Sequence, residues 1–249
     1  MIFYFSGTGN SEGIARIVAE HLGEKVRNII GAHPEEYVFT DEEYLGFVFP
    51  VYAWTAPEVM LDFAKKIHPG AAYTFAIATF SNVAGMALQH FSDILPLKSG
   101  FGIVMPDNYP VTERVLDTPE SSMAKLASAQ VRLDEVIERI RRKEEGFDVK
   151  MGDDAWDNTY VKAKMFNQLF RKTKPYYVTE ACIGCGMCAR VCPANAITMQ
   201  EKKPVWVKED CYLCMACLNR CPVEAIQYGE HSMGRPRYVF KGFSPENYK

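Results

Sequence analysis

The chain has 249 residues, of which 48% are hydrophobic and 24% are charged. This composition excludes a disordered chain, and no apolar run approaches the ~20 residues that cross a bilayer, so we expect one or two globular domains without a membrane span. Charge is uneven: residues 1–161 hold 14 Lys and Arg against 24 Asp and Glu, whereas residues 162–249 hold 14 against 7, so an acidic part precedes a basic part.

The N-terminus begins with an apolar run at residues 2–5 that passes directly into a glycine-rich turn. A cleaved signal peptide would need a basic segment, a longer apolar stretch and a cleavage site before this turn. Because these features are not found there, we expect no cleaved signal and a cytoplasmic location. Further apolar runs that are typical of buried strands occur at residues 25–30, 45–49, 73–79 and 101–105. Segments of helical period separate them, and the last has Thr118 as its N-cap and Pro119 in the first turn. The predicted fold class is α/β, with a doubly wound, five-stranded parallel sheet.

The glycine-rich turn lies between the first predicted strand and the first predicted helix. It reads Ser6-Gly7-Thr8-Gly9-Asn10-Ser11. Backbone N–H groups and a helix N-terminus bind anions at such a place, so the turn predicts a phosphate site. A P-loop would need a lysine, and a dinucleotide fingerprint would need glycine in place of Glu12. The hydroxyls and the Asn10 amide suit a terminal monoester phosphate instead; a degenerate loop and a site for another anion are the alternatives.

With the preceding Phe3-Tyr4-Phe5, this turn resembles the FMN phosphate loop of flavodoxins, and the resemblance extends over about residues 1–148. It implies a flavodoxin-like domain with FMN at the carboxyl ends of the strands. Tyr52 or Trp54 would stack on the isoalloxazine ring, with simple loop packing as the alternative. The implied FMN contacts are Ser6, Gly7, Thr8, Gly9, Asn10, Ser11, Pro50, Val51, Tyr52, Ala53, Trp54, Thr79, Phe80, Ser81, Asn82, Gly85, Asn108 and Tyr109.

Residues 149–175 are expected to connect two domains. This segment contains six large apolar or aromatic side chains, Trp156, Tyr160, Met165, Phe166, Leu169 and Phe170, and it ends in a basic run before Pro175. So much apolar surface is not normally left in water, which disfavours a floppy linker. We therefore predict an amphipathic helix that packs on one or both domains.

All eight cysteines lie in two runs of equal spacing, offset by 29 residues. The runs are Cys182-x2-Cys185-x2-Cys188-x3-Cys192-Pro193 and Cys211-x2-Cys214-x2-Cys217-x3-Cys221-Pro222. Thiolates are soft ligands for iron, and in this spacing the fourth cysteine of each run ligates the other cluster. The expected ligand sets are Cys182, Cys185, Cys188 and Cys221 for one cluster, and Cys192, Cys211, Cys214 and Cys217 for the second. Zinc usually takes separated cysteine pairs, and disulfides need an oxidising compartment, so both alternatives are disfavoured.

The cysteine runs resemble the bacterial ferredoxin motif with two 4Fe-4S clusters, and the resemblance covers about residues 176–228. We expect four segments: a flavodoxin-like FMN domain at 1–148, a connector at 149–175, a ferredoxin domain at 176–229 and a tail at 230–249. No nucleophile–base constellation and no nucleic-acid motif is found, so the basic stretch at residues 162–174 is expected to dock the acidic flavin domain or an acidic redox partner.

The whole arrangement resembles the family of ferredoxins with a flavodoxin-like N-terminal region, found largely in anaerobic bacteria and archaea. The resemblance implies an intracellular electron-transfer protein that passes electrons between FMN, two 4Fe-4S clusters and a redox partner protein. The alternative is an FMN-dependent reductase of a small substrate or a nicotinamide, supplied with electrons by its ferredoxin domain. An interaction protein without flavin is the third hypothesis. The sequence does not decide whether the protein is an enzyme.

Overall fold

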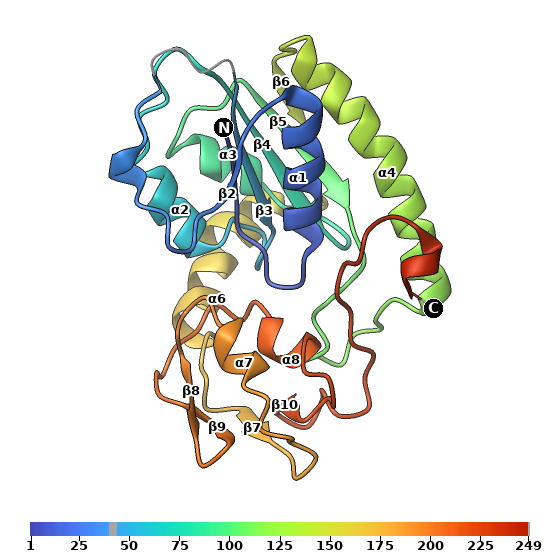
Figure 1. Ribbon diagram of the computed structural model, residues 1–249. Coiled ribbons are helices and arrows are strands. Elements are labelled where there is room, and N and C mark those ends of the chain that lie inside the picture. Colours follow the sequence, from blue (N-terminus) through green and yellow to red (C-terminus); the bar gives the residue numbers. More distant parts are fainter. Residues whose placement is uncertain (40–43, 249) are drawn as a thin grey trace.

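The structure is a computed structural model that describes residues 1–39 and 44–248. Its larger part is built on a parallel sheet of the order β2-β1-β3-β4-β5-β6 (Figure 1). The strands are β1 (Ile2–Tyr4), β2 (Val26–Asn28), β3 (Tyr44–Pro50), β4 (Tyr73–Phe80), β5 (Ser99–Val104) and β6 (Gly146–Asp148). The order of the first five is that of flavodoxin-like doubly wound folds, so the predicted fold class is confirmed.

The sixth strand was not predicted. The segment Gly146–Asp148 pairs in parallel with β5, at the edge of the sheet. It has no apolar run, since Phe147 is its one large apolar side chain and is 40% exposed at the sheet edge. The central strands β3 and β4 are buried along nearly their whole length, which is why their sequences are continuously apolar and easy to recognise.

Helices cover both faces of the sheet. The four that pack on it are α1 (Asn10–Leu22), α2 (Glu58–Ala64), α3 (Ala87–Ser92) and α4 (Pro119–Arg141), and a 3₁₀ helix (Pro34–Glu36) precedes β3. One apolar core joins α1 and α4 to the sheet, and a second joins α2 and α3 to it. As predicted, Thr118 caps α4: its hydroxyl oxygen accepts a hydrogen bond from the Ser121 N–H at 3.2 Å.

A helical connector leads away from the sheet. It consists of α5 (Ala155–Asp157), a π-helical turn (Asn158–Lys162) and α6 (Ala163–Leu169). Contrary to the expectation that its apolar side chains pack on the domains, Trp156, Met165 and Leu169 are each more than half exposed. The connector contacts the rest of the protein through buried Thr159 and Ala163, through the partly buried Phe166, and through Tyr160. The Tyr160 hydroxyl donates to the Asp93 carboxylate at 2.9 Å, and its ring lies edge-on to that of His90.

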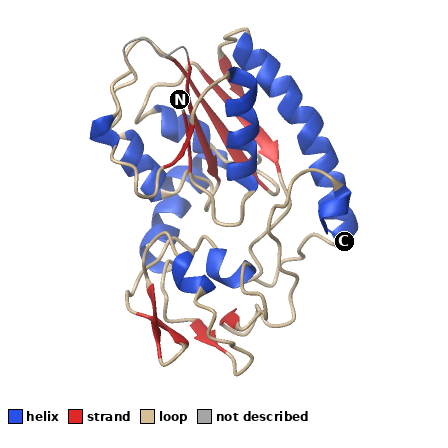
Figure 2. Cartoon of the chain, in the orientation of Figure 1, coloured by secondary structure: helices blue, strands red, loops and turns tan. Residues whose placement is uncertain are grey.

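A small, loop-rich region lies at the carboxyl ends of the sheet strands (Figures 1 and 2). It contains two antiparallel pairs, β7 (Tyr176–Val178) with β10 (Ile226–Tyr228) and β8 (Ile197–Gln200) with β9 (Lys203–Trp206). This region also contains two one-turn helices, α7 (Met187–Arg190) and α8 (Ala216–Asn219), on the side that faces the sheet. Within the described part of the chain, no helix is long and apolar enough to cross a membrane.

The C-terminal tail returns from the small region to the larger one and ends in a 3₁₀ helix (Pro245–Tyr248) beside α4 (Figure 1). Phe240, Phe243 and Tyr248 pack against the core beneath α1 and α4. The Phe240 N–H donates to the Thr8 carbonyl at 2.8 Å. The tail therefore fastens the small region to the glycine-rich turn.

Candidate functional site

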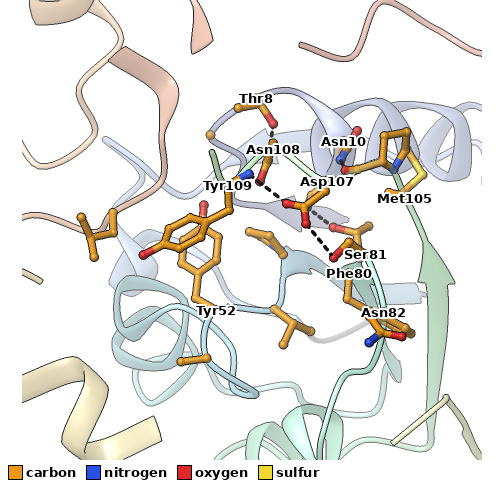
Figure 3. Close-up of a pocket in the computed structure, with 18 of the residues that line it drawn as sticks. Thr8, Asn10, Tyr52, Phe80, Ser81, Asn82, Met105, Asp107, Asn108 and Tyr109 are labelled. Carbon is orange, nitrogen blue, oxygen red and sulfur yellow. Dashed lines mark hydrogen bonds between the residues drawn. The ribbon is translucent and has the colours of Figure 1, made fainter. Parts of the chain in front are cut away.

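A cavity of about 360 Å³ opens at the carboxyl ends of β1, β3, β4 and β5 (Figure 3). Doubly wound sheets bind ligands at this edge, at the point where the strand order reverses. Four loops form most of its wall, at residues 6–11, 50–54, 79–83 and 105–109. All the residues predicted to contact FMN line this cavity except Gly9 and Gly85. The other lining residues are Val83, Met105, Pro106, Asp107, Arg114, Phe166, Tyr212 and Leu213.

The glycine-rich turn presents hydroxyl groups to the cavity. The Ser6 hydroxyl oxygen accepts a hydrogen bond from the Gly9 N–H at 3.1 Å, and the Thr8 hydroxyl oxygen accepts one from the Asn108 amide at 2.5 Å (Figure 3). Because both oxygens act as acceptors, their own hydrogens stay available to donate to an anion. Gly9 itself is the N-cap of α1, with a φ of 103°, and this left-handed backbone turns it out of the cavity wall.

Asn10 lines the cavity and also links three segments of the chain. Its amide nitrogen donates one hydrogen to the Pro106 carbonyl at 3.3 Å, and its amide oxygen accepts from the Tyr238 hydroxyl at 2.9 Å. The side chain thus ties the turn to the loop after β5 and to the C-terminal tail, while the second amide hydrogen keeps the anion contact a prediction. The tail lies more than 200 residues away in sequence, so no local pattern could reveal this role.

The loop after β3 makes a strained turn. Tyr52 and Thr55 exchange backbone hydrogen bonds of 2.9 and 3.2 Å, while Ala53 and Trp54 between them have φ values of 46° and 61°. Two consecutive left-handed residues are typical of a type I′ turn, which normally uses Asn or Gly. Strain of this kind in non-glycine residues clusters at binding sites, where the surroundings hold the backbone in place.

Aromatic rings form one side of the cavity. Tyr52 and Tyr109 lie next to each other there (Figure 3). Burial raises the pKa of the Tyr52 hydroxyl well above its usual value, and burial likewise raises the pKa of Tyr109. Within residues 1–39 and 44–248, the Tyr52 hydroxyl has no hydrogen-bond partner although it is buried. Both phenols therefore stay protonated and neutral, and the aromatic wall they form carries no charge.

Gly85 supports the Trp54 turn from outside the cavity. A Cβ atom at Gly85 would lie 2.7 Å from both the Trp54 Cβ and the Thr159 hydroxyl oxygen. That hydroxyl donates to the Trp54 carbonyl at 2.9 Å and accepts from the Met86 N–H at 2.8 Å. The connector thereby holds the turn through one buried side chain.

Replacing Thr159 with valine should therefore destabilise the protein by about 1–3 kcal/mol, because the Trp54 carbonyl and the Met86 N–H lose their buried hydroxyl partner. Thr159→Ser keeps the hydroxyl and serves as the control, with a smaller loss from the missing methyl group. Denaturant unfolding of both variants measures the difference. Equal stability of the valine and serine variants would contradict the assigned role.

The eight cysteines gather around two separate hollows in the small region. One hollow is lined by Cys192, Cys211, Cys214 and Cys217, which we call the inner set, and the other by Cys182, Cys185, Cys188 and Cys221, the outer set. Each hollow thus brings together three cysteines of one run and the last cysteine of the other. In the portion that the structure describes, no three His, Cys, Asp or Glu side chains are placed to hold a single metal ion. The thiols are spread around the walls of the hollows.

The two cysteine loops have the same backbone shape. Gly184 and Gly186 have φ values of 70° and 71°, and their equivalents 29 residues later, Leu213 and Met215, have 48° and 58°. The second loop thus adopts left-handed conformations without glycine, at a cost in strain. Burial of Leu213 and Met215, at 4% and 1% exposure, offsets this cost by filling the contact with the larger region.

Cavity and inner hollow share a wall. Tyr212 lines both, and its ring lies edge-on to that of Phe5, with centroids 6.0 Å apart. A Cβ atom on Gly7 would lie only 2.1 Å from the Cys214 carbonyl oxygen, so the glycine-rich turn packs directly on the cysteine loop. The Arg220 Nε–H donates to the Gly7 carbonyl at 3.1 Å. This bond places a cation beside the glycine-rich turn, and the sequence had not indicated that cation.

Sheet order and cysteine arrangement together define a two-part protein with a flavodoxin-like region and an iron–sulfur region. A family model described as a 4Fe-4S dicluster domain matches residues 181–225. The flavodoxin of Fusobacterium nucleatum bound to flavin mononucleotide is 18% identical, with a TM-score of 0.40, and the match covers 58% of this chain and 97% of that one. A mutant of that flavodoxin, also bound to flavin mononucleotide, is 15% identical, with a TM-score of 0.33 and coverage of 54% and 94%. No curated protein matches the chain.

The chain therefore combines a flavodoxin-like N-terminal region with a 4Fe-4S dicluster domain near residues 181–225. Eight cysteines in that domain support two 4Fe-4S clusters. Clusters of this kind exchange single electrons, so the protein belongs to the electron-transfer class and requires some redox partner.

Proposed function

We propose that the protein carries FMN in its cavity and passes electrons between this flavin, two 4Fe-4S clusters and a redox partner protein. The observation that carries the proposal is the wall that the cavity shares with the inner hollow, through Tyr212. Two redox groups on either side of one side chain are close enough to exchange electrons without a diffusing carrier. We further propose the domain limits 1–148, 149–175, 176–229 and 230–249.

The cavity fits FMN in its chemistry. Ser6 and Thr8 have hydroxyl hydrogens free for the phosphate, at the N-terminus of α1, whose dipole favours an anion. Arg220 adds positive charge beside Gly7. Tyr52 and Tyr109 supply the apolar, aromatic wall that a flavin ring requires. A cavity of about 360 Å³ is also within the range of cofactor sites.

Polar groups suited to the pyrimidine edge of the ring lie in the loops after β4 and β5. The Ser81 carbonyl accepts from Lys125 at 3.1 Å, and Lys125 also pairs with Asp117 at 2.8 Å. The Asp117 carboxylate accepts in turn from the Asp107 N–H at 2.7 Å. These contacts fix both loops before a ligand arrives, so binding costs less conformational entropy.

The two cysteine sets fit clusters equally well. Backbone N–H groups donate to thiol sulfurs at three places: Ala196 to Cys192 at 3.3 Å, Ala225 to Cys221 at 3.2 Å, and Leu213 to Cys211 at 3.4 Å. Such bonds stabilise thiolate ligands and tune the reduction potential. FMN can hold one or two electrons and each cluster exchanges one, so their combination joins single-electron and paired-electron chemistry.

Anaerobic purification followed by reductive titration tests this function. We expect about one FMN and about eight iron atoms per chain, and uptake of about four electrons, followed by absorbance and EPR. Iron without flavin would contradict the FMN assignment and leave the clusters intact. Zinc, or no metal at all in protein kept from oxygen, would contradict the cluster assignment.

A further inference from the structure

Arg171 is a buried cation at the junction of the two regions. It follows α6 and has only 3% of its surface exposed. Its Nη1–H donates to the Glu58 carboxylate in α2 at 2.8 Å, and its carbonyl accepts from the Cys211 N–H at 3.0 Å. The residue is therefore attached to the larger region by its side chain and to the inner set by its backbone.

The positive charge of Arg171 is incompletely neutralised. Its Nε and Nη2 atoms are buried and have no hydrogen-bond partner among the residues that the structure describes. The partner carboxylate of Glu58 is 49% exposed, whereas the Arg171 side chain is 4% exposed, so water screens the negative charge more than the positive one. The interior beside the inner set consequently has a positive potential.

Two cations lie near the outer set. Arg237 interacts electrostatically with Cys221, and its Nε and Nη1 atoms are buried without a hydrogen-bond partner among the described residues. Arg190 donates through its Nη1–H to the Cys185 carbonyl at 2.8 Å. Arg190 is exposed, and so is Cys185. An exposed guanidinium acts through water and has a weaker effect on a nearby redox group than a buried one.

We propose that Arg171 raises the reduction potential of the cluster bound by the inner set, the cluster that lies beside the flavin cavity. Reduction adds one electron, and thus one negative charge, to a cluster, and a buried positive charge favours that state. Burial of the inner set by itself would disfavour the added charge, so Arg171 offsets this effect of burial. The inference rests on the cluster part of the proposed function and does not need FMN.

EPR-monitored redox titration of the full-length protein tests this role. In Arg171→Met we expect one cluster potential to fall and the other to stay unchanged, while Arg171→Lys, which keeps the charge, stays closer to the wild-type value. Arg190→Met is the matched control and should shift either potential less than Arg171→Met does. Unchanged potentials in Arg171→Met, or an equal fall in Arg171→Lys, would overturn the proposal.

Two further variants complete the test. One shows which cluster the shifted potential belongs to, and the other replaces Arg171→Met if that variant misfolds. A chain without Cys192 and Cys211 retains the cluster of the outer set, whose potential should not respond to Arg171→Met. If Arg171→Met does not take up iron, the reduction potentials of Glu58→Gln are measured in its place. Loss of the carboxylate leaves the charge of Arg171 unpaired and should raise the potential of the inner cluster. No change or a fall in that potential would overturn the proposal. Iron counts of the wild type report separately on the cluster assignment, and FMN counts on the flavin assignment.

Discussion

Replacing Cys192 and Cys211 together with alanine should leave about four iron atoms per chain, whereas replacing Cys192 and Cys182 together should remove nearly all the iron. The reason is the arrangement around the two hollows, where Cys192 lies with Cys211, and Cys182 lies in the other set. The first pair therefore damages one cluster and the second pair damages both. If each run of four cysteines bound its own cluster, the two outcomes would be exchanged.

Iron analysis and EPR of the reduced protein measure this result in full-length chains purified without oxygen. The corresponding pair from the other set, Cys221 with Cys182, should again leave about four iron atoms, because both belong to the outer set. Since clusters contribute to folding in a region this small, the flavin spectrum serves as the control for an intact larger region. If both the Cys192 and Cys211 variant and the Cys221 and Cys182 variant lost nearly all their iron, neither cluster would form without the other. That result would contradict two sets that bind their clusters independently.

The cysteine sets were predictable from sequence because each run is a local structure. Three cysteines at intervals of three residues require a tight, left-handed loop, and the same loop recurs 29 residues later with nearly the same φ values. In the second loop, Leu213 and Met215 stand at the positions of the two glycines. The strain of these two residues is offset by contact with the larger region, which no local pattern encodes.

The sheet was predictable to the extent that its strands are buried on both faces. The strands β3 and β4 are continuous apolar runs, whereas β6 is an exposed edge strand of three residues that has no such signal. Likewise, predicted contacts fall in all four cavity loops, because the carboxyl ends of neighbouring parallel strands meet at one edge.

The part of the site that sequence reasoning missed comes from distant segments. Tyr212 and Arg220 belong to the small region, and Tyr238 belongs to the tail, yet all three contact the cavity wall or the glycine-rich turn. Hydrophobic period and motif spacing describe neighbours along the chain, and they carry no information on how two domains dock. These residues could be found only from the fold.

Replacing Gly7 with alanine should weaken FMN binding by about tenfold or more and lower the unfolding temperature, because inserting a methyl group into a closely packed contact costs about 1–3 kcal/mol. Its Cβ would lie 2.1 Å from the Cys214 carbonyl oxygen and 3.1 Å from the Cys214 carbonyl carbon. Neither can move without displacing the loop that carries three cysteines of the inner set. The proposed phosphate turn would therefore be pushed away from the cysteine loop.

Gly13→Ala is the matched control for this variant. Its Cβ would also lie 2.1 Å from a neighbouring atom, but that atom is Cε1 of the Phe240 ring, on a side chain of the tail that can rotate away. Alanine also favours the helix, by about 1 kcal/mol over glycine, which offsets the cost of moving the ring. Fluorescence titration of the flavin-free protein with FMN, together with thermal unfolding, compares the two variants. If Gly7→Ala binds FMN as tightly as Gly13→Ala and unfolds at the same temperature, the glycine-rich turn and the cysteine loop are not in contact in solution, and the short path between cavity and inner cluster is lost with them.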